Sequence, residues 1–376
     1  MRRLACFFIA VTLLFCGCSK VSYVQYRLVV HAIGIDKGES GGYKVTYQVF
    51  SPDKSQGSGG PTDASGSNVS TVVTFGDTLY EAEQNLELQT GRKAFFGNTE
   101  LILIGSGLTD RKIIEFISCF RESPDMYLGV DVVFASDDAE KTLSTQFPKG
   151  NASAQVLRET VDAAVDASCA SSARMIEISN ALFERGGSLI MPIVTVAVEE
   201  KAEGNESGDD KGTSNITCGS FANMLIKDGY PTAVIDRDCA KGIRLLDGTA
   251  EAMSFNVTVG EMLAAVRVDS LKIKREIRIS PSEYPIVKVS VTGRVTVKDN
   301  PDGILLEVVR RAAQEKMLSL CDLAYEKVIL ENGADSVDIS RLLRKYEPEY
   351  YLGCEENFEE VVKNTLFEVE IKLKTC

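Results

Sequence analysis

Two runs of alternating residues near the end of the chain constrain its fold more than any other feature. They are "YPIVKVSVTGRVTVKD" at 284–299 and "LFEVEIKLKT" at 366–375. The first run carries Val289, Val291, Val295 and Val297 on one side, and Ser290, Thr292, Arg294 and Thr296 on the other. The second alternates Phe367, Val369, Ile371 and Leu373 with Glu368, Glu370, Lys372 and Lys374. A period of two indicates strands with one buried side and one side in water.

A long helical pattern separates these two runs. It extends from about Asp302 to Asn332, with Gly333 as the expected C-cap, and a shorter helix at 338–347 ends before Pro348. Together with the alternating run at 270–279, these patterns predict an antiparallel sheet with one face covered by the long helix. The charged residues of the strands would form the solvated face of that sheet.

The N-terminal half combines strand and helix patterns. Residues 27–51 predict a hairpin, and the Gly/Ser-rich residues 51–71 predict a flexible loop. Thr78 and Glu81 form a capping box at the start of a helix that Gly91 would end. An amphipathic helix follows around 109–123, an Asp137/Glu140 pair could cap another, and 153–185 has a helical composition. This order predicts a layered α/β or α+β domain.

The patterns divide the mature chain into three mixed α/β domains with mainly antiparallel sheets. The predicted domains are 18–200, a small middle domain at 201–251 that includes the polar linker 201–215, and 252–376. Within the middle domain, a strand at 216–225 and a turn precede a helix that Asp236 could cap.

The first residues of the chain have the form of a secretory signal. Two arginines precede the apolar run from Leu4 to Phe15, which is too short to span a bilayer as a helix. Cys18 follows Gly17, where a bacterial lipoprotein signal places its acylated cysteine. A plain signal peptide that contains cysteines is the alternative, and a metal site is disfavoured because Cys16 would be lost on cleavage. We predict a signal peptide at 1–17 and lipidation of Cys18.

The amino-acid composition disfavours two kinds of binding partner, nucleic acids and anionic lipid surfaces. The chain has 376 residues, 44% of them hydrophobic and 25% charged, with a net charge of -13. An acidic chain without a basic cluster in its sequence is a poor nucleic-acid binder, because phosphate contacts need Lys and Arg. Electrostatic adhesion to anionic lipid is disfavoured for the same reason, so the membrane link would be the acyl chains.

Residues for catalysis or metal binding are scarce. The chain has one histidine, His31, in an apolar strand pattern, and neither a nucleophile elbow nor a phosphate-binding loop occurs. Beyond the signal region the cysteines show no C-x-x-C pair, although Cys218 and Cys239 could form a disulfide. We predict a protein that is not an enzyme and has no cofactor or metal site.

Several segments, in order, resemble the Ger(x)C family of spore germination lipoproteins, the C subunits of nutrient germinant receptors. The lipoprotein cysteine is followed by "GID" at 34–36 and by "YKVTYQ" at 43–48. Then come "GDTLYEAEQNL", "RKAFFGNTELILIG", "FRESPDMYLGVDVVFAS", "SLIMPIV", "GSFANMLIKDG", "KGIRLLDG" and "VDISRLLRKYEPEYY". The chain departs from the family where Ser19 and Lys20 replace a Trp-Asp pair, and where Asn98 stands in place of a histidine.

The resemblance implies a receptor component. A lipid on Cys18 would hold three α+β domains at the outer face of the inner spore membrane, where the chain would associate with receptor A and B subunits in nutrient-triggered germination. One rival is a solute-binding lipoprotein that delivers a nutrient to a permease. Another is a hydrolase that uses paired carboxylates such as Glu81 with Glu83, or Asp137 with Asp138.

Overall fold

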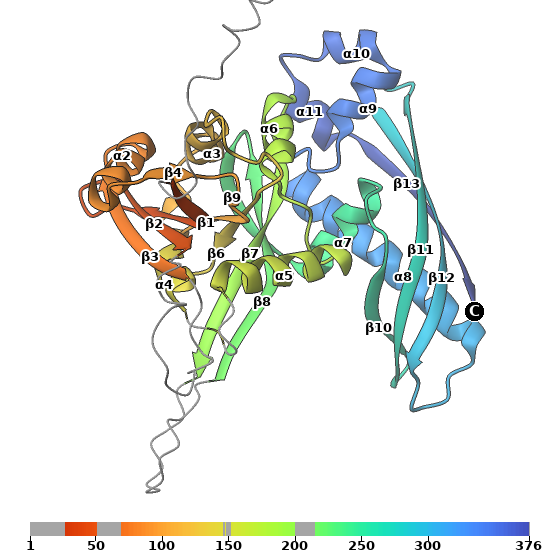
Figure 1. Ribbon diagram of the computed structural model, residues 1–376. Coiled ribbons are helices and arrows are strands. Elements are labelled where there is room, and N and C mark those ends of the chain that lie inside the picture. Colours follow the sequence, from red (N-terminus) through yellow and green to blue (C-terminus); the bar gives the residue numbers. More distant parts are fainter. Residues whose placement is uncertain (1–26, 51–68, 146, 148–151, 200–214, 376) are drawn as a thin grey trace, which may run out of the picture.

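A computed structural model of the chain describes residues 27–50, 69–145, 147, 152–199 and 215–375. Over these residues the chain builds two sheets with helices packed on and between them (Figure 1). The predicted α+β class with mixed sheets is confirmed.

The larger sheet has nine strands in the order β3-β2-β1-β5-β6-β7-β8-β9, with β4 paired to β1. Its strands are β1 (Arg27–Lys37), β2 (Tyr43–Phe50), β3 (Val69–Gly76), β4 (Lys93–Phe95), β5 (Leu101–Ile104), β6 (Asp131–Ala135), β7 (Leu189–Glu199), β8 (Asn215–Lys227) and β9 (Tyr230–Asp236). β5 and β6 pair in parallel with their neighbours, whereas the outer strands β2, β3, β8 and β9 pair antiparallel.

Helices cover both faces of this sheet. One face packs against α2 (Leu79–Thr90), α3 (Ile113–Arg121) and α6 (Met175–Phe183). The other packs against α4 (Ala139–Ser144) and α5 (Ser153–Asp166). All four residues of β5 are fully buried, as the apolar run "LILI" requires of a strand covered on both sides.

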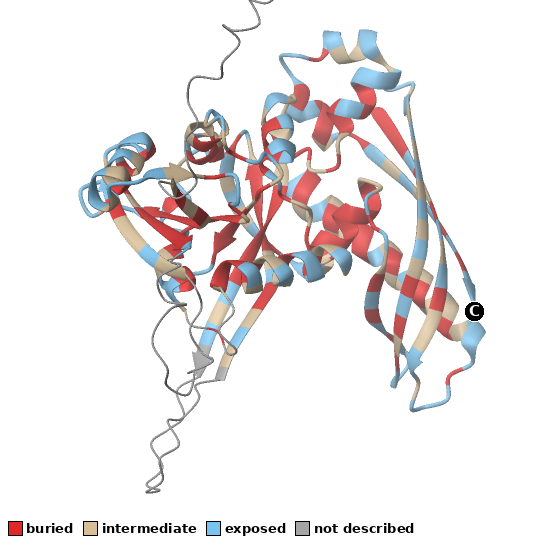
Figure 2. Ribbon diagram, in the orientation of Figure 1, coloured by how far each residue is buried: buried red, intermediate tan, exposed pale blue. Residues whose placement is uncertain are grey.

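The smaller sheet has four strands in the order β10-β11-β12-β13. They are β10 (Met253–Val259), β11 (Met262–Ile279), β12 (Pro285–Asp299) and β13 (Leu366–Thr375). The predicted alternation is visible as buried and exposed residues in turn along these strands (Figure 2). Helix α8 (Leu306–Ala324) packs on the apolar face, as the sequence predicts.

The sequence prediction that this sheet is antiparallel is wrong for β13. β12 and β13 pair in parallel, from Ile286 opposite Leu366 to Val295 opposite Thr375. The reason is the connection between them, since a strand that returns after a crossover through α8 runs in the same direction as the strand before it.

The segment 215–246 contributes two strands to the large sheet and one helix to the core beside the small sheet. β8 and β9 extend the nine-stranded sheet, and α7 (Arg237–Leu246) packs between that sheet and α8. These strands therefore form no separate sheet among the described residues, in contrast to the small middle domain expected from sequence; the proposed domain boundaries themselves remain a prediction. Leu225 and Ile235 share one core with α7 and the smaller sheet. The predicted Asp236 cap is confirmed, because its carboxylate accepts a hydrogen bond from the Cys239 amide at 2.8 Å.

Several predicted element bounds differ from the structure. Residues 69–71 belong to β3, because Val69 pairs with Phe50, and the rest of the predicted loop lies outside the described residues. The helical region at 153–185 is two helices, separated by Ser168 with a left-handed φ of 56°. The long helix begins at Leu306 and continues as a π-helical segment, η5 (Tyr325–Glu331), before Gly333 at φ 61°. The shorter helix is α9 (Ile339–Tyr346), and α10 (Pro348–Gly353) and α11 (Phe358–Lys363) follow it.

Candidate functional site

The predicted lipidation site, Cys18, lies outside the described residues, as do the signal segment 1–17 and most of the linker 201–215. The described chain begins at Arg27, which pairs with Asp125 and stacks on the Phe95 ring at 5.5 Å. Among the described residues, none of the helices has the length and apolar character that crossing a bilayer requires.

The "GID" segment has a structural explanation in the fold. The buried Asp36 carboxylate accepts hydrogen bonds from the amides of Ala139 at 2.7 Å and Glu140 at 2.9 Å. It therefore caps α4 from a distant part of the chain, in place of the Asp137/Glu140 cap expected from sequence. Burial raises the pKa of Asp36, while these two amides act in the opposite direction. A Cβ at Gly34 would lie 3.0 Å from the Leu143 side chain and 3.1 Å from the Ala139 Cβ, so glycine lets α4 pack closely here without displacing either neighbour.

The "KGIRLLDG" segment joins the two sheets. It forms α7, where Lys241 and Arg244 are buried and donate to the carbonyl oxygens of Ser254 and Thr249. A Cβ at Gly242 would lie 1.9 Å from the carbonyl oxygen of Leu320, so α7 and α8 touch backbone to backbone. This segment holds the structure together and presents no reactive group to solvent.

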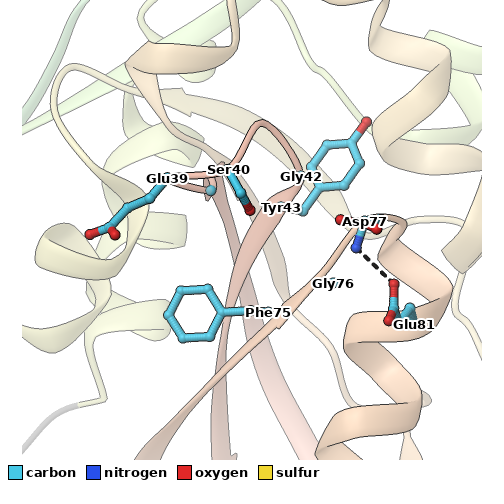
Figure 3. A pocket seen from close by; sticks show the side chains of 9 residues that line it. Glu39, Ser40, Gly42, Tyr43, Phe75, Gly76, Asp77 and Glu81 are labelled. Carbon is cyan, nitrogen blue, oxygen red and sulfur yellow. Dashed lines mark hydrogen bonds between the residues drawn. The ribbon is translucent and has the colours of Figure 1, made fainter.

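A cavity of about 480 Å³ opens beside the turn between β1 and β2 (Figure 3). Its rim carries Glu39, Ser40 and the exposed ring of Phe75, and Glu81 closes it from α2. The Glu81 carboxylate accepts from the Asp77 amide at 2.8 Å, and Thr78 caps the helix by accepting from the Glu81 amide at 3.1 Å. Thr78 thus acts as predicted, whereas the carboxylate of the expected capping box binds one residue earlier.

A second cavity, of about 670 Å³, lies between α2 and α3. Tyr43 is shared by both cavities, and Arg111 donates to its hydroxyl at 2.9 Å and to the carbonyl oxygen of Gly41 at 2.7 Å. Burial raises the pKa of Tyr43, and it raises the pKa of the neighbouring Cys119 thiol to about 11. Neutral tyrosine and cysteine side chains, with a guanidinium engaged by the turn between β1 and β2, do not form an activated nucleophile.

The described residues form two parts of the molecule, one built on the nine-stranded sheet and one on the four-stranded sheet. A third cavity, of about 370 Å³, lies where these two parts meet. Ion pairs cross it from Lys227 to Glu359 at 2.9 Å and from Arg185 to Glu355 at 3.6 Å. Lys363 and Lys227 hold the pKa of the Glu359 carboxyl down to about 2. At its floor Asp335 accepts from the amides of Ile339 and Ser340, each at 2.7 Å, and burial raises its pKa to about 6. These contacts hold the two parts together.

One carboxylate of each pair proposed for the hydrolase rival makes a local contact. Glu81 binds the Asp77 amide, and Asp137 accepts from the Asp138 amide at 2.9 Å and pairs with Lys141. Their positions give the pairs a structural explanation at the start of a helix.

The remaining candidate groups are dispersed. Cys218 and Cys239 are free thiols in the structure, on β8 and α7, and the His31 ring packs against Phe50. Across the described ranges, no cluster of three or more His, Cys, Asp or Glu side chains is placed to hold a metal ion. Sequence inspection missed the Asp36 cap, because Asp36 lies far along the chain from the start of α4, and a lone Asp in an apolar run was the only available signal. It also missed the Asp335 cap, although Asp335 lies only four residues before Ile339, the first residue of α9.

Comparison with known proteins identifies the family of the chain. Residues 21–196 match the model described as the spore germination protein N-terminal domain, and residues 224–375 match that described as spore germination B3/GerAC like, C-terminal. The chain belongs to the GerAC family of spore germination proteins. No curated protein matches this GerAC-family chain.

A solved structure shares its fold. The crystal structure of the GerBC protein aligns with a TM-score of 0.57 and 16% sequence identity, over 96% of this chain and 99% of that one. At this identity the likeness concerns the fold, which the GerAC-family chain shares over nearly its whole length.

Proposed function

We propose that this chain is the lipoprotein C subunit of a spore nutrient germinant receptor, required for nutrient-triggered germination. The observation that carries the proposal is the match of two spore germination family models, in order, to 21–196 and 224–375. In this proposal the chain assembles with the receptor A and B subunits, which are integral membrane partners.

The chemistry of the described surface supports an assembling protein and not an enzyme. The charged groups of the cavities are largely engaged in helix caps and ion pairs, as with Arg111 and Glu359. The family segments around Asp36 and Gly242 serve the packing of helices on sheets. We propose no cofactor, metal or nucleic-acid partner.

The lipid on Cys18 would hold the chain at the outer face of the inner spore membrane. A single acyl chain gives only marginal membrane binding, so stable anchoring needs more than one chain on a lipoprotein cysteine. Cys18 and Cys16 provide a matched pair of variants. Cys18→Ala is expected to release the protein from the membrane fraction, whereas Cys16→Ala, inside the predicted signal, leaves it there. Retention of the Cys18→Ala protein in the detergent phase would disprove the anchor.

The assembly is tested by tagging the full chain and solubilising spore membranes in mild detergent. We expect a multi-span membrane protein and a second large receptor subunit to co-purify with it. Isolation of the chain alone, or with a permease, contradicts the proposal and favours the solute-binding rival. Thermal-shift screening with amino acids separates that rival further, because a bound ligand stabilises the fold by mass action.

A further inference from the structure

The four-stranded sheet has one face without a cover among the described residues. Its inner face packs on α7, α8 and α9 in the C-terminal core, whereas the alternate residues of β11, β12 and β13 are exposed or half-buried (Figure 2). Because α7 and α8 lie between the two sheets, this open face points away from the nine-stranded sheet (Figure 1).

Cations dominate one half of the open face, although the whole chain has a net charge of -13. We call this half the basic face; its cations are Arg267, Lys272, Lys274, Arg294, Lys372 and Lys374. The acidic residues on the same strand rows are Asp269 and Glu370, and Glu370 pairs with Lys372. The other five cations have no ion pair with any described residue. The basic face is therefore a surplus of positive charge on an acidic protein.

The register of the strands places like charges side by side. Arg294 is the direct partner of Lys374 across the β12–β13 pair and of Asp269 across the β11–β12 pair, and Lys272 and Lys372 flank Thr292 from the two sides. Like charges opposite each other destabilise a sheet, and two acidic residues stand against six cations on these rows, so the surplus charge does not stabilise the fold. A local surplus of like charge that Asp269 and Glu370 only partly offset indicates a surface selected for binding.

We propose that the basic face docks an acidic polypeptide segment of a partner protein. Charge complementarity supports this occupant, since a surplus of Lys and Arg steers and orients an anionic partner. A lipid surface fits less well, because a lipid on Cys18 would keep the bilayer within about 30 Å of Arg27. Arg27 begins β1 in the nine-stranded sheet, and the basic face points to the other side (Figure 1). The inference concerns the surface and stands whether or not the chain works in a germinant receptor.

The test uses the full chain in mild detergent with fluorescent poly-L-glutamate as the probe, followed by anisotropy at low and high salt. The variant is Lys272→Gln/Arg294→Gln/Lys372→Gln. The control is Arg92→Gln/Lys93→Gln/Arg237→Gln, which removes the same charge from exposed positions outside the face. We expect the variant to lose roughly tenfold in affinity, since each exposed ion pair contributes modestly. The control is expected to bind like the native chain, and salt should weaken the native binding.

The other outcomes overturn the proposal. If variant and control lose the same affinity for poly-L-glutamate, the binding depends on overall charge and not on the basic face. If the native chain does not bind poly-L-glutamate at low salt, the basic face is not a docking site for an acidic polypeptide. Phosphatidylglycerol vesicles form the second arm: binding to vesicles but not to poly-L-glutamate, lost in the variant, would make the occupant a lipid surface. In intact membranes, carbodiimide is expected to couple Lys272 or Lys372 to a carboxylate of another polypeptide, and coupling only within the chain contradicts the proposal.

Discussion

The two sheets bury their apolar side chains in different ways. The nine-stranded sheet has helices on both faces, and its central strand β5 is apolar at every position. The four-stranded sheet has helices on one face, and its strands alternate apolar residues with charged ones. The first arrangement hides every side chain of its central strand, whereas the second leaves half of each strand free to carry binding chemistry.

The two sheets meet in a single hydrophobic core, which we call the joint. Leu225 and Ile235 of the large sheet pack in the same cluster as α7, α8 and the inner residues of the small sheet. The two sheets therefore share one hydrophobic core where they meet. They differ in the face that lies away from this core, which, among the described residues, helices cover in the large sheet and leave open in the small one.

The largest effect is expected at the joint. Gly242→Ala places a Cβ 1.9 Å from the Leu320 carbonyl oxygen, which forces α7 and α8 apart. We expect the free energy of unfolding to fall by about 3 kcal/mol. Gly353→Ala is the control, because a Cβ there meets no atom within 4 Å. Denaturant unfolding of the full chain measures both variants, and equal stability of the two would show that the joint is not tightly packed.

The cap in the large sheet is expected to have the next largest effect. Asp36→Ala removes the acceptor of two amides at the start of α4, and we expect a loss of about 2 kcal/mol. Asp138→Ala serves as the comparison, since Asp138 occupies the N-cap position but makes no side-chain capping bond. If Asp138→Ala costs as much as Asp36→Ala in the same unfolding assay, the distant cap is not what holds α4.

The matching cap in the other part is expected to respond to pH. Burial raises the pKa of Asp335 from 3.8 to about 6, so between these values the folded chain binds more protons than the unfolded one. Its contribution to stability is therefore full below pH 3.8 and is lost as the pH rises through 6. We expect Asp335→Asn to remove up to about 1.4 kcal/mol per pH unit from the pH dependence in that window. Identical slopes of unfolding free energy against pH for the two proteins would contradict this.

The smallest effect is expected at the ion pairs between the two parts. The pKa of Glu359 is lowered from 4.5 to about 2, so its contribution is present above pH 4.5 and is lost as the pH falls through 2. This is opposite in sign to Asp335. Because Glu359 is about half exposed, we expect Glu359→Gln to cost only about 0.5 kcal/mol at neutral pH, and less in high salt. A salt-independent loss would indicate packing and not charge.

Local patterns in the sequence predicted much of the secondary structure. Thr78, Asp236 and Gly333 act at helix ends as expected, because capping depends on residues within a few positions of each other. The strands at 284–299 and 366–375 follow their period-two pattern within a residue, and the α+β class and the family follow from the order of such segments. The site predicted from sequence, Cys18, stays a prediction outside the described residues.

The tertiary structure decided how these elements are paired and what their outer faces carry. The parallel β12–β13 pair, β8 and β9 in the large sheet, and the distant Asp36 cap join segments that no local period connects. The basic face arises in the same way, because scattered Lys and Arg residues become neighbours only through strand register. Periodicity of two or 3.6 residues records which side of an element is buried. The choice of the partner that buries it depends on contacts between distant parts of the chain.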